Sequence, residues 1–575
     1  MGAPFIVTGP NAAALFTLKL YRGESMVLLA MNWKAPKPPT DFVGFAIQYK
    51  EPPPHDDRFY SLNNRLAFSA AGGKVNPTTL STMLSPIQKF RWVHFPRNAE
   101  LPGSFIYRVS PVFMDAHDVL SYGAAQEVAI ELRRETYPGQ VNLAFTRGFV
   151  SSQAFVDRYG AKAIPQLLPK KSADGLTFKS TYKTQKDSEA AHAWMGFEVR
   201  EAMLAVLDQA IADAGAQVRV VAYDLDEPEI LSRLVQLGTR LKVVLDDSDK
   251  HGLPASAETA AWKQLVTSAG AGNVMRQHMK KLQHNKTIVV DGPATQVVVC
   301  GSTNFSWRGL YVQNNNAMVL KGVGPVAVFK SAFEEYWKNN PGQFSAPSTN
   351  WTSLGLSGID AKATFSPHSA GNERLQSIAD DIATTKSSLF YSLAFLYQTK
   401  GAIRDGITTI TADASRFVYG ISDRKVGGGL DVQKPNGNVK PVYPSQLSKN
   451  LPEPFKSEPT GGSGDFGTRM HHKFVVIDFD DPAAARVYLG SYNFSPPADT
   501  DNGENLLLVR DQRIAVSYLV EALRIFDHYH FRVTQNEKGK KQLVLARPPR
   551  KKGQKPWWSE YYSDARKIRD RQLFA

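Results

Sequence analysis

One pattern of polar residues occurs twice in this chain and constrains its fold more than any other feature. The pattern is His-x-Lys, four further residues, Asp and, some ten residues later, Gly-Ser-x-Asn-Phe-Ser. The first copy runs from Gln283 to Ser306 and the second from Met470 to Ser495. At average residue frequencies, one chance His-x-Lys-x4-Asp in 575 residues has a probability on the order of a few per cent. Two copies followed by the same hexapeptide therefore indicate an internal duplication.

The segments around both copies alternate between strand and helix patterns. Before the first copy, strands are predicted at 141–145, 218–223 and 241–245, and helices at 198–214 and 228–237. Before the second copy, helices are predicted near 372–385 and 401–409, and strands near 389–393 and 417–420. This alternation predicts a parallel or mixed sheet covered by helices. The two halves, 139–345 and 346–535, look like two copies of one α/β unit.

Residues 1–138 show a different pattern. Short alternating strands, such as 43–49 and 105–113, are separated by turns rich in Pro and Gly. This predicts an antiparallel β-sandwich, and the region resembles a fibronectin type III-like or immunoglobulin-like domain. No cluster of titratable groups in it suggests catalysis, so we expect an accessory domain.

Two further segments each leave alternatives open. Residues 423–470 form a long polar, Gly-rich loop, and loops of this length are commonly functional lids or disordered linkers. Residues 536–575 form a basic tail that contains Trp557-Trp558 and Tyr561-Tyr562. Such a tail can stack single-stranded bases, lie at a lipid interface or pack on the body of the protein with its charges in solvent.

The spacing within the motif suits phosphate chemistry. Residues i and i+2 of a strand face the same side, so the His and the Lys project together, while the residue between them, His472 in the second copy, points elsewhere. The His offers a nucleophile or an acid, and the Lys offers a fixed cation for a phosphate oxygen. Two such half-sites, facing each other, would surround one phosphodiester. His192, His251 and His278 lie outside the motifs and are expected to be ordinary core or surface residues.

The paired motifs resemble those of the phospholipase D superfamily, and the resemblance covers about residues 140–535. It implies a tandem pair of phospholipase D-like α/β/α sandwich domains related by pseudo-twofold symmetry. It also implies a two-step displacement at phosphorus through a covalent phosphohistidine. His284 would be the nucleophile, by the family's usual order alone, and His471 the general acid and base. Lys286 and Lys473 would hold the phosphate, and Asp291 and Asp478 would orient the histidines.

The resemblance implies further substrate-binding residues from the hexapeptides and from the segment that follows the second one. These are Ser302, Asn304, Ser306, Ser491, Asn493, Ser495 and Glu504. Glu504 matches an acidic residue often found at that place in the family, whereas the first half has Asn314-Asn315-Asn316. This asymmetry is compatible with unequal roles for the two histidines.

The charge and the composition limit which binding partners and metal sites are expected. The net charge of +14 favours a polyanionic partner, either nucleic acid or an anionic membrane surface, although a basic protein without such a partner stays open. The single cysteine, Cys300, excludes an intrachain disulfide and a Cys-rich zinc site. No cluster of metal ligands is visible elsewhere, so we expect no metal, no cofactor and full activity in EDTA.

The remaining expectations concern location and substrate. No apolar stretch approaches the ~20 residues of a membrane span, and residues 1–10 do not resemble a secretion signal. A cytoplasmic location is expected, with export by another route left open. Two motifs in one chain predict a monomer. Phospholipase D-type hydrolysis of phospholipids, with or without transfer to another alcohol, is slightly favoured over a metal-independent nuclease acting on DNA or RNA. A binding module without activity is a third alternative, which the two intact motifs make improbable.

Overall fold

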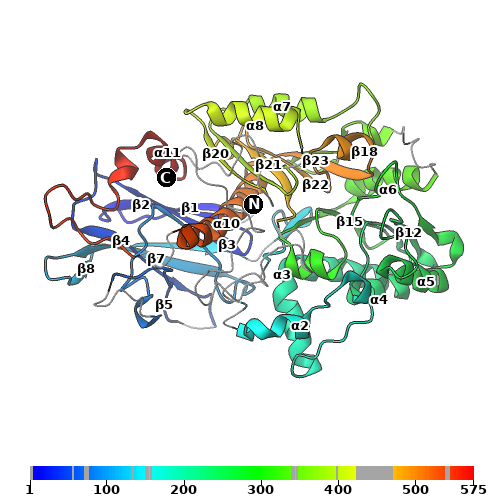
Figure 1. Cartoon of the computed structure of the whole chain (residues 1–575), viewed down its shortest axis with the longest axis horizontal. Coiled ribbons are helices and arrows are strands. Elements are labelled where there is room, and N and C mark those ends of the chain that lie inside the picture. The colour runs from blue at the N-terminus through cyan, green and yellow to red at the C-terminus, as the bar shows by residue number, and fades with distance from the viewer. Residues whose placement is uncertain are drawn as a thin grey trace.

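The described residues of the computed structural model form four β-sheets, and two of these sheets contain the strands of the two motif copies (Figure 1). It describes residues 4–54, 57–69, 77–132, 135–148, 155, 158–338, 344, 347–396, 399–422, 470–537 and 544–575. The predicted lid, apart from Met470, lies outside the described residues. No helix among the described residues is long and apolar enough to cross a membrane.

The N-terminal region consists of two antiparallel sheets that share one core. The first sheet contains β1 (Ile6–Thr8), β2 (Phe16–Gly23), β3 (Met26–Trp33) and β6 (Arg91–His94). The second contains β5 (Tyr60–Ser61), β4 (Phe42–Lys50), β7 (Ser104–Met114), β8 (Leu120–Tyr122) and β9 (Gln126–Glu131). Side chains alternate between buried and partly exposed along most of β7, as a half-buried strand requires. Phe16 of one sheet packs on Phe45 of the other, with ring centroids 5.1 Å apart.

The first α/β unit is a mixed seven-stranded sheet with the order β10-β16-β15-β14-β11-β12-β13. Its strands are β10 (Val141–Phe145), β11 (Gln217–Ala222), β12 (Leu241–Leu245), β13 (Val274–Arg276), β14 (Thr287–Asp291), β15 (Gln296–Gly301) and β16 (Asn316–Lys321). Only β11, β12 and β13 are parallel to one another, because helices connect them. The helices are α2 (Ile164–Leu167), α3 (Gln185–Ala212), α4 (Pro228–Leu237), α5 (Ala257–Ala269) and α6 (Val323–Lys338).

The second α/β unit is also a seven-stranded sheet, with the order β17-β18-β23-β22-β21-β19-β20. Its last six strands repeat the first six of the other sheet, whereas β17 and β13 are additional edge strands. Its strands are β17 (Thr352–Ser353), β18 (Asp360–Ser366), β19 (Ser388–Leu393), β20 (Phe417–Ile421), β21 (Lys473–Ile477), β22 (Arg486–Gly490) and β23 (Glu504–Arg510). Its helices are α7 (Leu375–Ala383), α8 (Ala402–Ala412), α9 (Pro496–Thr500) and α10 (Gln512–Glu537). In both units, the strand that follows His-x-Lys lies between a strand paired with a parallel neighbour and the antiparallel strand after it. The strands and helices predicted before each motif are present, with ends that differ by a few residues, except that α3 begins at Gln185, thirteen residues before the predicted start at 198.

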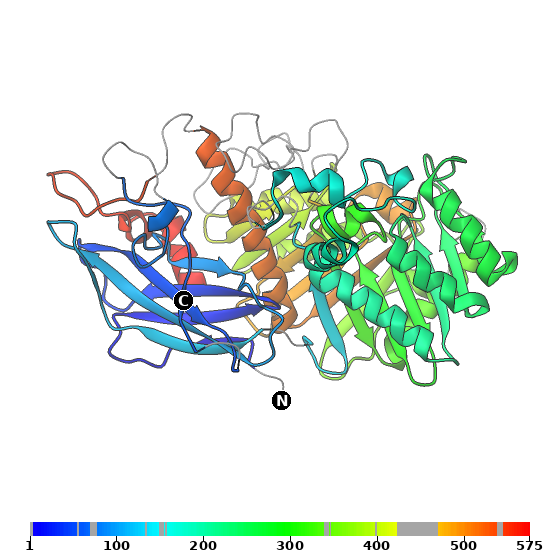
Figure 2. The same cartoon turned by 90° about the horizontal axis from the view of Figure 1, so that it is seen from below.

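One large hydrophobic core joins the three regions. It contains residues of β3, of both α/β sheets, of α6 and of α10. Helix α10 lies between the N-terminal sheets and the α/β units, as Figure 2 shows. The two half-sites are therefore held on a single packed body.

The C-terminal segment returns to the N-terminal sheets (Figure 1). Trp557 and Trp558 pack in the core that these sheets share, and Phe574, after α11 (Ala565–Leu573), is buried in the large core. Of the alternatives for the aromatic residues of the tail, the structure supports packing on the body of the protein.

Candidate active site

Both motif histidines line one cavity of about 730 Å³ between the two α/β units. His284 and Lys286 lie immediately before β14, and Lys473 is the first residue of β21. The prediction that the whole His-x-Lys segment lies within a strand is therefore wrong by a few residues. Asn304, Asn493 and Ser495 also line the cavity, together with Ser172, Tyr223, Asp224, His251, Leu282, Arg308, Gln313, Phe395, Thr399, Lys400, Pro496, Pro497 and Asn502.

His284 is held from the opposite half of the chain. Its Nδ1 lies 2.8 Å from both carboxylate oxygens of Glu504, at the start of β23. The hydroxyl of Ser491 donates to the same carboxylate at 2.6 Å. Burial raises the pKa of Glu504 to about 8, although the lysine charges oppose this, and burial lowers the pKa of His284 well below its ordinary value. Because Nδ1 is occupied, Nε2 is the nitrogen left to react.

His471 is held in the equivalent way by residues of the first half. Its Nδ1 lies 2.8 Å from Oδ1 of Asn315, which also accepts a hydrogen bond from Ser302 at 3.0 Å. The amide nitrogen of Asn315 donates to the carbonyl of Gly309 and to Gln313, so these partners fix the orientation of the amide. An amide oxygen only accepts, so Nδ1 of His471 carries a proton and Nε2 is a base when the ring is neutral.

Two buried lysines stand beside the histidines. Lys286 Nζ donates to the carbonyl of His284 and lies 4.8 Å from the centre of the Tyr223 ring. Lys473 Nζ lies 3.0 Å from Nε2 of His471. Burial lowers the pKa of Lys286 to about 8 and that of Lys473 well below its ordinary value. These two ammonium groups would lose less hydration than free lysines when they meet an anion, because burial has already removed much of it.

The two motif aspartates lie away from the histidines, so their predicted orienting role is wrong. Asp291 is at the far end of β14, where it pairs with Lys330 at 2.6 Å and accepts from Gln296 at 2.8 Å. Asp478 accepts from the backbone amides of Lys386 and Ser387 at 3.0 and 2.8 Å. Both carboxylates fasten the sheet to neighbouring segments.

The predicted substrate-binding residues fall into two groups. Ser302, Ser306 and Ser491 are at most 1% exposed, and Glu504 is fully buried. These four are not among the residues that line the cavity, and neither are Lys286 and Lys473, which are 1% exposed. Asn304, Asn493 and Ser495 line the cavity, and Ser495 also caps α9. The side-chain nitrogen of Asn304 donates to Asp224 at 2.6 Å.

His472 points away from the cavity, as the spacing predicts. Its Nε2 lies 3.0 Å from Glu521 of α10, and both side chains are fully buried. Glu521 also pairs with Arg147 and Arg524. This ionic network, defined here as Arg147, His472, Glu521 and Arg524, fastens the second motif to α10.

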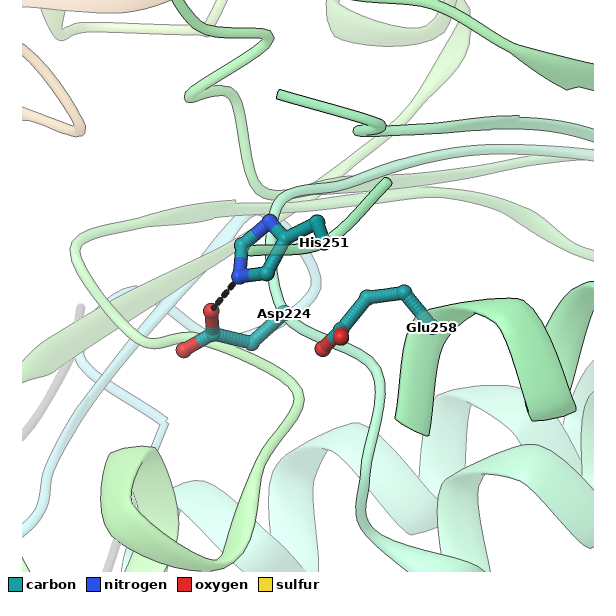
Figure 3. Close-up of side chains that lie close together, drawn as sticks. All are labelled: Asp224, His251 and Glu258. Carbon is teal, nitrogen blue, oxygen red and sulfur yellow. Dashed lines mark ion pairs between the residues drawn. The ribbon is translucent and has the colours of Figure 1, made fainter. Parts of the chain in front are cut away.

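Sequence reasoning missed a charged group on the first-half side of the cavity (Figure 3). His251, expected to be an ordinary histidine, lies between Asp246 (Nδ1 to Oδ2, 2.7 Å) and Asp224 (Nε2 to Oδ1, 3.2 Å). Burial opposes its charge, but the hydrogen bonds to Asp224 and Asp246 outweigh burial and raise its pKa to about 10. Asp246 directly follows β12 and Asp224 lies two residues after the end of β11, and polar residues just after adjacent parallel strands were the signal available.

The same group corrects the expectation that the chain contains no cluster of metal ligands. One ligand atom from each of Asp224, His251 and Glu258 lies within 4.8 Å of the other two. The phosphoryl-transfer residues predicted from the motifs are separate from these three.

Comparisons with known proteins find a family match around the first copy of the motif. Residues 207–337 match the family described as the cardiolipin synthase, phospholipase D-like domain. The phospholipase D of Rickettsia bellii (strain RML369-C) is 30% identical over 122 residues, which cover 20% of this chain and 58% of that protein. The phospholipase D of Rickettsia typhi is 43% identical over 49 residues, 8% of this chain and 22% of that protein. The chain thus spans less than two thirds of the length of these curated relatives.

Two solved structures align with parts of this chain. Phosphatidylserine synthase of Haemophilus influenzae aligns with a TM-score of 0.40 and 17% identity, covering 57% of this chain and 84% of that one. Nuc, a phospholipase D family member from Salmonella typhimurium, aligns with a TM-score of 0.19 and 25% identity, covering 24% and 87%. The match over residues 207–337 contains the first copy of the motif, and the second copy lies on the same cavity.

Proposed function

We propose that this chain is a phosphodiesterase that works through a covalent phosphohistidine and hydrolyses phospholipids. One observation carries the proposal: His284 and His471 line one cavity, and each has Nδ1 bound by a residue of the other half. Since one chain supplies both half-sites, we propose that it acts as a monomer. The N-terminal sheets, residues 1–138, would be accessory to the two catalytic units, 139–345 and 346–535.

In the first step, Nε2 of His284 attacks phosphorus. The bond from phosphorus to the leaving alcohol breaks, and the alcohol oxygen takes a proton from Nε2 of His471. The phosphorylated imidazole carries a positive charge, which the carboxylate of Glu504, 2.8 Å from Nδ1, stabilises. This arrangement favours His284, rather than His471, as the nucleophile, because the partner of His471 is the neutral Asn315.

The second step reverses the roles. Neutral His471 takes a proton from water, the water oxygen attacks phosphorus, and the phosphorus–nitrogen bond to His284 breaks. An alcohol in place of water would give transfer instead of hydrolysis. Burial lowers the pKa of His471 well below its ordinary value, and the anionic substrate would raise this pKa, so that the ring can carry the proton that the first step requires.

Lys286 and Lys473 would hold the non-bridging phosphate oxygens. Asn304 and Asn493, which line the cavity, would add neutral hydrogen bonds to the same charge. Lys286 lies directly before β14, Lys473 is the first residue of β21, and Asn304 and Asn493 lie three residues after β15 and β22. The donors are therefore in place before the charge develops, and such preorganisation is the largest electrostatic contribution to catalysis in many enzymes.

Two observations favour a phospholipid substrate. The curated relatives that match this chain carry the name phospholipase D. The second-half side of the cavity is lined by Phe395, Pro496 and Pro497, an apolar surface suited to the hydrocarbon part of a lipid. The net charge of +14 favours the second candidate, a nuclease that would contact the phosphate backbone rather than bases.

The test measures product release in EDTA from mixed phospholipid vesicles and from labelled single- and double-stranded nucleic acid in parallel. Head-group release with intact nucleic acid would support the lipid proposal, and the converse would make the chain a nuclease. The His284→Ala variant should bind substrate without turnover. His278→Ala is the control, because His278 is exposed and its ion pair among the described residues is with Asp247. Turnover by His284→Ala would overturn the mechanism, and absence of turnover by the unaltered chain on every substrate would favour the binding module.

A further inference from the structure

Asp224, His251 and Glu258 converge from three elements at the first-half edge of the cavity. Asp224 follows β11, His251 follows β12, and Glu258 lies in the first turn of α5. Figure 3 shows the Glu258 carboxylate pointing toward Asp224 and His251. The three ligand atoms lie within 4.8 Å of one another, and Asp224 and His251 line the cavity. A cation could therefore reach the three groups from the cavity.

His251 is already oriented as a metal-binding histidine would be. Its Nδ1 is fixed by Asp246, which is fully buried and accepts further hydrogen bonds from Ser248 at 2.5 Å and from the backbone of Gln283 at 2.7 Å. A carboxylate on one ring nitrogen sets the direction in which the other nitrogen points and raises its basicity, and it is the usual partner of a ligating histidine. Nε2 is thereby directed toward Asp224.

Glu258 is a buried carboxylate without a strong partner. It is 4% exposed, and the hydrogen bond that it accepts from described residues, from the backbone of Leu225, is long at 3.3 Å. Within the described part of the chain, it takes part in no direct ion pair. A buried carboxylate is costly unless it is paired or coordinates a metal, so a cation between Glu258, Asp224 and His251 would compensate its charge.

We propose that Asp224, His251 and Glu258 bind one divalent transition-metal ion of the Zn²⁺ class beside the phosphodiester site. One imidazole nitrogen and two carboxylate oxygens are ligands that Zn²⁺ accepts, whereas Mg²⁺ and Ca²⁺ prefer oxygen alone. The ion would take the place of the proton between His251 Nε2 and Asp224 Oδ1. Oδ2 of Asp224 would keep its hydrogen bond from Asn304, so the motif need not rearrange.

The bound ion would not take part in phosphoryl transfer, but it would affect the position of the segment that carries His284. Asp246, which orients His251, also accepts from the backbone of Gln283, the neighbour of His284. The Tyr223 ring lies between the two histidines, 4.5 Å from His251 and 4.7 Å from His284, centre to centre. Occupancy of the site would therefore stiffen the segment that carries the nucleophile.

The test is calorimetric titration of the metal-stripped full chain with ZnCl₂ and, in parallel, with MgCl₂ and CaCl₂. We expect one Zn²⁺ per chain and much weaker binding of the other two ions. Asp246→Asn should weaken Zn²⁺ binding about 10–100-fold, the usual effect of losing a partner of a ligating histidine, and His251→Gln and Glu258→Gln should weaken it more. Thermal unfolding would check that each variant is folded.

Two control variants test whether Zn²⁺ binds at this site rather than at another histidine. His278→Ala removes an exposed histidine with one carboxylate partner, and His284→Ala removes the nucleophile, so neither should change Zn²⁺ binding. Unchanged binding in His251→Gln, or loss of binding in either control, would overturn the proposal. If a variant fails to fold, anomalous scattering at the zinc edge from crystals of the unaltered chain decides: a peak between the three side chains supports the site, and a peak elsewhere or none refutes it. The result does not depend on phosphodiesterase activity, because no substrate is present.

Discussion

Nδ1 of His284 lies 2.8 Å from the carboxylate of Glu504, whereas Nδ1 of His471 lies 2.8 Å from the neutral amide oxygen of Asn315. The two contacts occupy equivalent places in the two halves, since Ser302 donates a hydrogen bond to Asn315. In the same way, Ser491 donates a hydrogen bond to Glu504. A carboxylate stabilises a histidine that must carry a lasting positive charge, as a phosphohistidine does. A neutral amide suits a histidine that must gain and lose a proton.

The first prediction separates the two roles with an aryl phosphodiester, whose leaving group departs without a proton. His471→Ala should release a burst of the aryl alcohol and accumulate labelled protein, because the second step still needs a base. On ordinary substrates this variant should lose about 10²–10⁴-fold in turnover. His284→Ala should show neither burst nor label, and a burst in that variant would reverse the assignment. Rapid-quench kinetics with a labelled substrate measures both.

The second prediction concerns pH. Burial raises the pKa of Glu504 to about 8, so its stabilising charge is lost as the pH falls below that value. Burial lowers the pKa of Lys286 to about 8, so the phosphate-holding charge is lost as the pH rises above it. The pH profile of kcat/KM, which reports the free enzyme, should be a bell with its maximum near 8.

Two variants test which residue causes the fall in kcat/KM on each side of this pH profile. Glu504→Gln should reduce kcat and remove the acid limb, because the amide does not titrate. Lys286→Arg should move the alkaline limb upward, because arginine stays charged. An acid limb that persists in Glu504→Gln would show that another group controls it.

The third prediction concerns metal removal. The groups assigned to phosphoryl transfer are histidines, lysines and asparagines, so turnover should persist in EDTA even if the site at Asp224, His251 and Glu258 is emptied. Steady-state rates before and after dialysis against EDTA, followed by readdition of ZnCl₂, measure this. Loss of turnover that ZnCl₂ restores would place the ion in the reaction path.

The motif positions could be read from the sequence because they repeat, and the strands because their apolar runs are continuous. The aspartate role could have been rejected in advance. A strand rises about 3.3 Å per residue, so the five residues of β14 carry Asp291 far from His284. The partners of the histidines could not be predicted, because they come from the opposite half and depend on how the two units pack.

The charged group around His251 could not be predicted from the repeated motif for a different reason. In the register of the two sheets, Val221 faces Thr287 and Ser392 faces Phe474, so the counterpart of Asp224 in the second half is Phe395. A comparison of the repeats therefore finds nothing at this place. The difference arises after the strand ends, where each half is free to carry its own chemistry.

The fourth prediction concerns the ionic network at α10. Burial opposes the charge of Glu521, but Arg524, Arg147 and His472 outweigh it and hold the pKa of Glu521 well below its ordinary value. Its contribution to stability is therefore present at neutral pH and is lost as the pH falls through the folded-state pKa. Glu521→Gln should lower the free energy of unfolding by about 3–5 kcal/mol at neutral pH, since it removes the carboxylate that Arg147, His472 and Arg524 share, although Arg147 keeps its pair with Glu198.

Urea unfolding at neutral and acid pH checks this, and the difference between variant and parent should shrink in acid. Glu127→Gln is the matched control, because its pair with Arg108 on β7 and β9 is about half exposed. An exposed pair contributes no more than about 1 kcal/mol. A Glu521→Gln effect as small as that of the control would show that the network adds no net stability.

The last prediction tests whether the tail is structural. Trp558 is 7% exposed, donates from Nε1 to the carbonyl of Pro39 at 3.2 Å and belongs to the core of the N-terminal sheets. Trp558→Ala should lower the free energy of unfolding by about 3–5 kcal/mol, as for other buried aromatic residues. Replacement of the exposed Lys551 and Lys552 by Gln should change it by no more than about 0.5 kcal/mol. If Trp558→Ala instead leaves stability unchanged and weakens binding to anionic vesicles, the aromatic residues of the tail serve as a membrane contact.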